Sequence, residues 1–120
     1  MVRTQTELMV GVTHDRLFGP LLAFGLGGVF IEVLRDVVFR IPPLAEEEAL
    51  EMIRSIRGYP LLQGYRGHPP ADIPALQNLL LRISQLVEEV PELAELDINP
   101  LVALEPGQGC RVLDARIRVE

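Results

Sequence analysis

Short apolar runs separated by glycine and proline occupy the first forty residues, a pattern typical of strands joined by tight turns. We predict three strands, at Leu8–Thr13, at Leu21–Phe24 and from Val29 to about Leu34. The third strand would continue through 37–39 after a bend at 35–36. Because parallel neighbours need a long crossover and these connections are short, we expect antiparallel pairing.

Two segments in the middle of the chain have the periodicity of amphipathic helices. A proline pair at 42–43 ends the strand region, and Ala45–Ile56 follows with apolar residues at helical spacing and three glutamates in its first turn. Asp72 is placed to cap a second helix, whose apolar face ends before Pro91. Between them, Gly58–Pro70 is rich in glycine and proline and is predicted to be an irregular, ordered loop.

The last thirty residues are predicted to form a hairpin. Glu95–Asn99 alternates polar and apolar residues, Leu101–Leu104 continues this strand, and Arg111–Val119 returns after a turn at Glu105–Gly109. The order of strands, two helices and strands indicates an α+β domain with a mostly antiparallel sheet and two main helices.

The predicted hairpin brings the most informative polar residues together. Strand alternation places Asp97 and Asn99 on one face. With a turn centred near Gly107, Asp114 comes within about one residue of lying opposite Asn99. These side chains offer the hard oxygen donors that Mg²⁺ takes, usually together with water and nucleotide phosphates. The same spacing is equally consistent with Asp and Asn residues that only flank a turn beside Pro100 and cap its backbone groups.

A Gly-x-Gly-Gly motif is formed by Gly25, Gly27 and Gly28. It is not a dinucleotide-binding fingerprint, because Phe30 stands where that motif needs a small residue and no helix follows to hold a pyrophosphate. Two interpretations remain. One is a tight turn between strands that requires positive φ, which the sequence alone favours, and the other is a flexible backbone that closes over phosphate.

Composition narrows the classes of function. The chain carries 17 acidic side chains and 11 basic ones, all of them arginines. Its net charge of −6 and the lack of a clustered basic stripe argue against nucleic acid as a partner. Every apolar run is shorter than a membrane span and the first residues show no targeting signal, so we expect a cytoplasmic protein with no membrane partner. The single cysteine, Cys110, is expected to be buried and inert, and His14 and His68 to be surface loop residues without companions.

Six short motifs follow one another along the chain, at Glu7–Asp15, Phe18–Pro20, Phe24–Gly28, Glu32–Asp36, Asp97–Leu101 and Asp114–Arg116. This ordered set resembles the ATP-grasp domain of ADP-forming acyl-CoA (acetyl-CoA) synthetases, relatives of the succinyl-CoA synthetase β subunit. Each motif alone is weak, but the combination is specific and the resemblance covers essentially the whole chain. It implies that the fold is the C-terminal lobe of an ATP-grasp domain.

The resemblance also implies roles for the residues singled out above. In that family the Asn of the (Asp/Glu)-Ile-Asn-Pro motif and the Asp of the following strand bind the Mg²⁺ of the nucleotide, which corresponds to Asn99 and Asp114. Asp97 takes the acidic position near the arriving phosphohistidine, where the succinyl-CoA relatives have Glu. The glycines at 25–28 would lie near the phosphates of ATP or ADP. The implied reaction converts acyl-CoA, ADP and phosphate into the acid, CoA and ATP, through acyl phosphate and phosphohistidine.

The same resemblance implies that the chain is part of a larger enzyme. In the family, the lobe with the phosphate-contacting lysine and the adenine-binding hinge precedes this one, and the phosphorylated histidine and the CoA site lie elsewhere. We therefore expect a single domain over residues 1–120, with 1–6 as a tail, that is inactive alone. Its partners would be the N-terminal ATP-grasp lobe and the CoA-binding and ligase domains, which carry the CoA thioester substrate. Whether the chain also forms a homo-oligomer is left open.

Two other functions remain open at this point. The chain could be a noncatalytic regulatory or partner-binding module, such as the synthetase-like part of a protein acetyltransferase fusion. An unrelated α+β domain would be indicated if Asn99 and Asp114 lay far apart or on opposite faces of the sheet.

Overall fold

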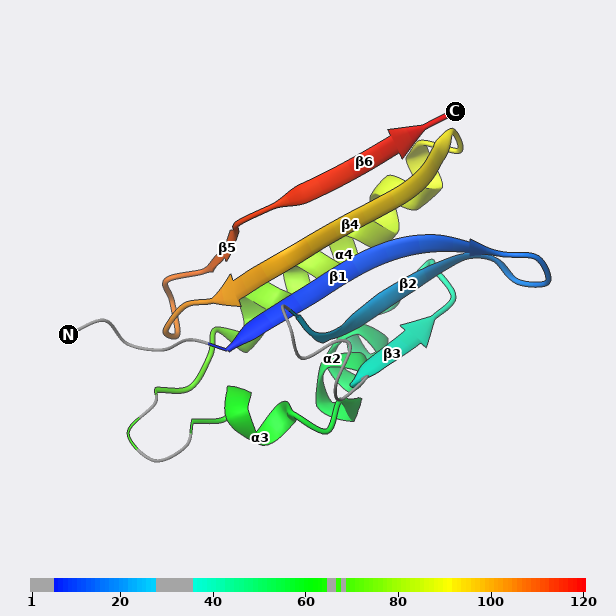
Figure 1. Ribbon diagram of the computed structural model, residues 1–120. Coiled ribbons are helices and arrows are strands. Elements are labelled where there is room, and N and C mark those ends of the chain that lie inside the picture. The colour runs from blue at the N-terminus through cyan, green and yellow to red at the C-terminus, as the bar shows by residue number, and fades with distance from the viewer. Residues whose placement is uncertain (1–5, 28–35, 65–66, 68) are drawn as a thin grey trace.

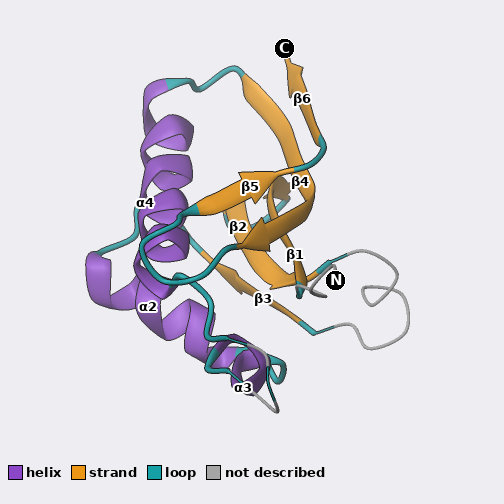
Figure 2. Cartoon of the chain, turned by 90° about the vertical axis from the view of Figure 1, so that its left-hand side faces the viewer, coloured by secondary structure: helices purple, strands orange, loops and turns teal. Residues whose placement is uncertain are grey.

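The computed structural model describes residues 6–27, 36–64, 67 and 69–120. In this part of the chain six strands form one antiparallel sheet, in the order β3-β2-β1-β4-β5, with β6 also paired to β4. Helices α2 and α4 lie on one side of the sheet, and its other side carries no described helix (Figures 1 and 2). The α+β class and the antiparallel pairing predicted from the sequence are therefore confirmed.

The N-terminal part of the sheet is a meander. It consists of β1 (Glu7–Asp15), β2 (Gly19–Leu26) and β3 (Val37–Arg40), each paired with the next. The first two match the predicted strands, and β3 matches the predicted continuation of the third. The remainder of that third strand, Val29–Leu34, lies outside the described residues.

The C-terminal part is the predicted hairpin with a break in its returning strand. The long strand β4 (Leu93–Ala103) pairs with β1 on one side and on the other with β5 (Cys110–Val112) and β6 (Ala115–Val119). Gly107 and Gly109, with φ of 86° and 85°, make the tight turn in a conformation that other residues adopt only with strain.

The two main helices have the predicted positions, α2 at Glu46–Ser55 and α4 at Ile73–Glu89. Between them the predicted irregular loop is partly wrong, because Tyr59–Leu62 forms a short helix, α3, with Pro60 in its first turn. Proline fits there because the first helical N–H groups have no partner within the helix, and Leu62 is buried in the core. Over the described part of the chain, no helix combines the length and apolar character needed to cross a membrane.

The core lies between the helices and the sheet. Alternate residues of the strands point toward the apolar faces of α2 and α4, as expected for a sheet with one covered face. Its largest fully buried side chains are Leu8, Val10, Leu22, Phe24, Met52, Ile53, Leu62, Leu76, Leu80 and Leu101.

Asp72 joins the second main helix to the C-terminal hairpin. Its carboxylate is buried, and Oδ1 accepts a hydrogen bond of 3.2 Å from the backbone N–H of Ala75, which caps α4 as predicted. Oδ2 accepts two more, from the N–H groups of Gly107 at 3.0 Å and Gly109 at 2.8 Å. One side chain therefore holds both the start of α4 and the turn that sets the register of the hairpin.

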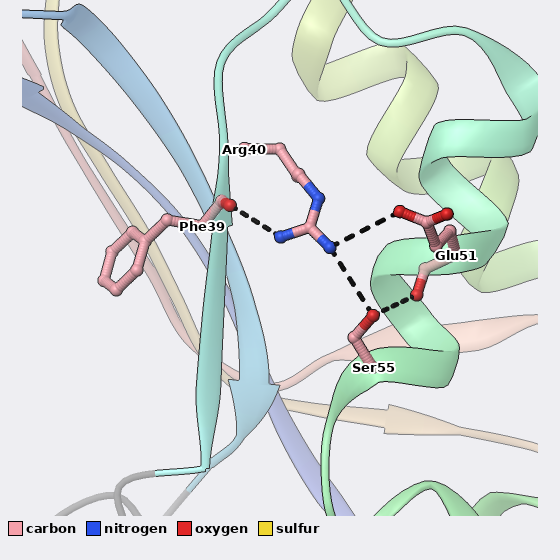
Figure 3. A network of polar contacts seen from close by, with 4 residues as sticks. All are labelled: Phe39, Arg40, Glu51 and Ser55. Carbon is pink, nitrogen blue, oxygen red and sulfur yellow. Dashed lines mark hydrogen bonds and ion pairs between the residues drawn. The ribbon is translucent and has the colours of Figure 1, made fainter.

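A polar network joins the edge strand β3 to α2 (Figure 3). The Arg40 guanidinium donates to the Phe39 carbonyl at 2.8 Å and to Ser55 Oγ at 3.4 Å, and it lies 3.7 Å from the Glu51 carboxylate. Ser55 Oγ in turn donates to the Glu51 carbonyl at 2.7 Å. Because Glu51 is largely exposed, the ion pair contributes little to stability.

Candidate functional site

The two predicted metal ligands lie opposite each other in the C-terminal hairpin. The backbone N–H of Asn99 donates to the carbonyl of Asp114 at 3.1 Å. Next along the hairpin, Asp97 of β4 is paired with Arg116 of β6. The pairing predicted from a turn near Gly107 is therefore confirmed, and the residues do not lie far apart as an unrelated domain would have them.

The polar residues of β4 share the face of the sheet that lacks described helices. Leu96 and Ile98 are buried beneath the helices, whereas Asp97 is exposed and Asn99 is half-buried. This alternation confirms the prediction that Asp97 and Asn99 point away from the core. Residues directly opposite in an antiparallel pair project to the same side, so Arg116 joins Asp97 on that face.

An open hollow of about 960 Å³ lies on this face. One row of paired residues crosses it from edge to edge, namely Phe39, Ala23, Gly11, Asp97 and Arg116. Ala23 and Gly11 are the smallest residues of the row, so the floor of the hollow is low there. The exposed ring of Phe39 stands at one end of the row and the charged residues stand at the other.

Gly27 lies directly against the Asn99 side chain. The Gly27 N–H donates to the Glu7 carbonyl at 2.8 Å, which holds the end of β2 on β1. A Cβ at this position would lie 2.3 Å from the Leu8 carbonyl oxygen and 2.8 Å from Asn99 Oδ1, both too close. Glycine is therefore required here, because a side chain would clash with the Leu8 carbonyl and with the Asn99 amide.

The predicted glycine turn is wrong for the two glycines that the structure describes. Gly25 lies inside β2, Gly27 follows that strand, and neither has positive φ. A Cβ at Gly25 would lie 2.2 Å from the Asp36 carbonyl oxygen, so this glycine permits the close approach of β2 and β3. The sequence pattern could not separate a turn from a close approach, because glycine serves both. Gly28 lies outside the described residues.

Asp36 anchors the backbone beside these glycines. Its carboxylate is buried and accepts hydrogen bonds from the N–H groups of Arg57, at 2.7 Å to Oδ1, and Gly58, at 2.6 Å to Oδ2. Its carbonyl accepts the N–H of Leu26 at 3.0 Å. Asp36 therefore ties the end of β2 to the segment that follows α2.

The histidines and the cysteine lie outside this hollow or outside the described residues. His14 is exposed at the end of β1, in a strand rather than the predicted loop, with Nδ1 2.9 Å from the Ala94 carbonyl oxygen. His68 lies outside the described residues. Cys110 is half-buried rather than buried, and burial, with a smaller effect from the Asp72 carboxylate, raises the pKa of its thiol.

A metal site made only of charged or imidazole ligands is not present in the described part of the chain, where no three His, Cys, Asp or Glu residues converge. Asn99 and Asp114 offer an amide oxygen and a carboxylate, the hard donors that Mg²⁺ takes together with water or ligand oxygens.

In the row that crosses the hollow, only Asp97 was assigned a role from the sequence, and the other members, Gly11, Ala23, Phe39 and Arg116, were not. Their place in one row depends on the register of four strand pairs, which a single sequence does not specify. Gly11 and Ala23 are small residues on neighbouring strands, and this was the signal that the sequence offered. It indicates a hollow only when β1 and β2 are known to pair with these two residues opposite each other.

Comparison with known proteins identifies the family. A family model described as the ATP-grasp domain matches residues 1–119. The chain is 46% identical over 118 residues to the β subunit of acetate–CoA ligase (ADP-forming) II from Pyrococcus furiosus, covering 98% of this chain and 50% of that protein. It is also 46% identical over 117 residues to 4-hydroxybutyrate–CoA ligase (ADP-forming) from Nitrosopumilus maritimus, covering 98% of this chain and 17% of the ligase.

A solved structure agrees with these matches. An acetyl-coenzyme A synthetase from Candidatus Korarchaeum cryptofilum, in complex with coenzyme A and Mg-AMPPCP, superposes with a TM-score of 0.91 at 43% identity, covering 100% of this chain and 55% of that one. The chain thus spans about half the length or less of these relatives. It belongs to the ATP-grasp domain family and is homologous to the ATP-grasp region of ADP-forming acyl-CoA synthetases.

Proposed function

We propose that the chain is the nucleotide- and magnesium-binding C-terminal lobe of an ADP-forming acyl-CoA synthetase, which converts acyl-CoA, ADP and phosphate into the acid, CoA and ATP. The observation that carries this proposal is the backbone hydrogen bond that sets Asn99 opposite Asp114, with the Asn99 side chain beside Gly27. The names of the acetate–CoA and 4-hydroxybutyrate–CoA ligases support the reaction class.

The residues present fit a magnesium ion. An amide oxygen and a carboxylate are hard donors of the kind that Mg²⁺ prefers, and two protein ligands leave room for water and phosphate oxygens. The Asn99 side chain lies against Gly27, where a larger residue would clash with its Oδ1. Asn99 and Asp114 would hold the ion, which when bound would neutralise charge on the phosphates during phosphoryl transfer.

Asp97 would orient the group that exchanges phosphate with the nucleotide. It is exposed on the same face as Asn99, two residues away along β4. A carboxylate in this place can accept the N–H of an incoming imidazole and fix which ring nitrogen carries the phosphoryl group. The structure of the relative from Korarchaeum has a phosphohistidine segment pointing towards its nucleotide site. A shorter Asp in place of Glu would require that segment to come closer to the sheet.

The proposed lobe would need a partner on its open side. The hollow is lined from one face only, and the chain contains no lysine to hold phosphates. A second ATP-grasp lobe would cover the nucleotide, and further domains would bring CoA and the acyl group. We therefore expect the chain to bind Mg-nucleotide weakly and to show no synthetase activity by itself.

A chimera tests the proposed function. The matching portion of the Pyrococcus furiosus β subunit would be replaced by this chain, and ATP formation from ADP, phosphate and acetyl-CoA would be measured in the assembled enzyme. We expect activity, and a loss of about a hundredfold in Asn99→Ala and Asp114→Ala, because each removes an oxygen that stabilises transition-state charge. Asp97→Asn should lower the rate by a similar factor.

The matched control is Glu47→Gln, a change of an exposed carboxylate in the first turn of α2. It should leave the rate within about twofold, because the charge lies far from any proposed ligand and is screened by water. Full activity in the folded Asn99 and Asp114 variants would contradict the proposed metal site. A folded but inactive parent chimera would favour the noncatalytic module.

A further inference from the structure

We propose that Arg116 is a further substrate-binding residue of this lobe, whose guanidinium holds a phosphate group of the nucleotide next to the metal ion. The proposal rests on the proposed function, since it assumes that the nucleotide phosphates lie on the open face. It goes beyond the metal ligands, because it assigns the cation that neutralises the phosphates from the side of β6.

The position of Arg116 supports this role. It lies opposite Asp97 on the neighbouring strand and lines the same hollow (Figure 1 shows β4 and β6 side by side). It also follows Asp114 by two residues, and two residues of extended chain span about 7 Å. A cation at Arg116 and a metal held at Asp114 could therefore contact neighbouring phosphate groups of one nucleotide.

The other charged residues of the hollow do not form a described ion pair with Arg116, so its guanidinium can bind a phosphate group. The hollow is lined by two carboxylates, Glu95 and Asp97, and by two guanidinium groups, Arg116 and Arg118. Arg118 is already used, since it lies 3.5 Å from the Glu95 carboxylate and also pairs with Glu120. Among the residues that the structure describes, none forms an ion pair with Arg116.

The positive charge of Arg116 would offset an unfavourable charge on the same face of the sheet. Asp97 would repel an approaching phosphate, and an opposite charge directly across the strand pair offsets that repulsion. Because the chain has no lysine, an arginine must supply the cation on this lobe. The guanidinium fork also matches two phosphate oxygens at once, which a single ammonium group does not.

The test uses the full 120-residue chain in two nuclear magnetic resonance titrations, one with Mg²⁺ alone and one with ADP at saturating Mg²⁺. For Arg116→Gln we expect ADP affinity to fall about tenfold, because a charge-assisted hydrogen-bond pair is lost. The response of the Asn99 and Asp114 amides to Mg²⁺ alone should stay unchanged. Arg116→Lys should recover part of the loss, because it restores charge without the fork.

Arg118→Gln is the matched control, on the same strand and lining the same hollow, but already paired with Glu95. It should bind ADP within about twofold of the parent chain, since an exposed pair contributes little. Well-dispersed amide spectra establish that each variant is folded.

Each outcome decides between the two proposals. If Arg116→Gln binds ADP as tightly as the parent while Asn99→Ala and Asp114→Ala do not, the role of Arg116 is refuted and the proposed function stands. An equal loss in Arg116→Gln and Arg118→Gln would refute a specific contact in favour of general charge. If ADP with Mg²⁺ perturbs no amide of the open face in the parent chain, both proposals fall.

Discussion

At the scale of single residues, the candidate site depends on two glycines whose neighbours leave no room for a side chain. Gly27 has no Cβ, and Asn99 Oδ1 lies 2.8 Å from where that atom would be. Gly25 similarly makes room for the carbonyl of Asp36. These two glycines are fixed by packing against neighbouring strands, so their replacement tests the geometry of the site without removing any proposed ligand.

Gly27→Ala should destabilise the fold by about 1–3 kcal/mol, because the new methyl group must displace the Leu8 carbonyl and the Asn99 amide. Urea unfolding monitored by circular dichroism measures this. Gly11→Ala is the milder comparison, since its Cβ would lie 3.2 Å from the nearest atom, the Leu96 carbonyl oxygen. A Gly27→Ala variant as stable as the parent would show that β2 does not approach Asn99 this closely.

Cys110 should give the protein a pH-dependent reactivity. The pKa of its thiol is raised above 9.0, first by burial and then by the nearby Asp72 carboxylate. The thiolate is therefore disfavoured in the folded chain, and alkylation by iodoacetamide at pH 9 should be slower than in the chain unfolded by urea. Asp72→Asn removes the second cause and should speed alkylation.

The corresponding effect on stability has a definite sign. Because the pKa of the Cys110 thiol is higher in the folded chain than in the unfolded chain, the folded state holds this proton to higher pH. The free energy of unfolding is therefore unaffected by the thiol below its usual pKa, and it falls as the pH rises through the pKa of the folded chain. Cys110→Ser should lack this loss above pH 9. A parent chain with the same alkaline profile as the serine variant would contradict the raised pKa.

At the scale of elements, the C-terminal hairpin is positioned by a helix that precedes it. Asp72 caps α4 and also accepts hydrogen bonds from the turn glycines at 107 and 109. That turn determines which residue of the returning strand faces Asn99, and a slip of one residue would send alternate side chains to the other face. A buried aspartate on another element thereby fixes the register on which the proposed ligands depend.

Asp72→Ala should cost about 2–4 kcal/mol, because it removes a helix cap and leaves two turn N–H groups without their acceptor. Urea unfolding gives the total, and amide hydrogen exchange should show faster exchange at Gly107 and Gly109. Glu51→Gln, which alters the exposed pair with Arg40, serves as the control and should change stability by less than about 0.5 kcal/mol. Unchanged exchange at both glycines would refute the coupling.

At the scale of the whole molecule, local patterns and pairing differ in how far they can be predicted. Helical periodicity located α2 and α4, apolar runs between glycines and prolines located β1 and β2, and alternation located β4. The capping role of Asp72 was also predicted, because capping is local, but its bonds to the turn were not, since they cross 35 and 37 residues. The short helix α3 was missed because its single turn is too short to show a period.

The candidate site was predictable to the extent that it lies in one hairpin. The opposition of Asn99 and Asp114 followed from one turn, whereas the contact of Gly27 with Asn99 requires β2, β1 and β4 to be adjacent. The order of strands in the sheet is a tertiary property that depends on burying one face under the helices. The sequence therefore indicated the proposed ligands, and the fold shows the small residues Gly11 and Ala23 that form the floor of the hollow beside Asp97.

The most direct test of this account is a crystal structure of the chain with ADP and Mn²⁺, a substitute for Mg²⁺ that scatters anomalously. We predict an anomalous peak about 2.2 Å from both Asn99 Oδ1 and a carboxylate oxygen of Asp114, on the face of the sheet that carries Asp97. A peak bound elsewhere, or nucleotide bound without either of these residues, would contradict it.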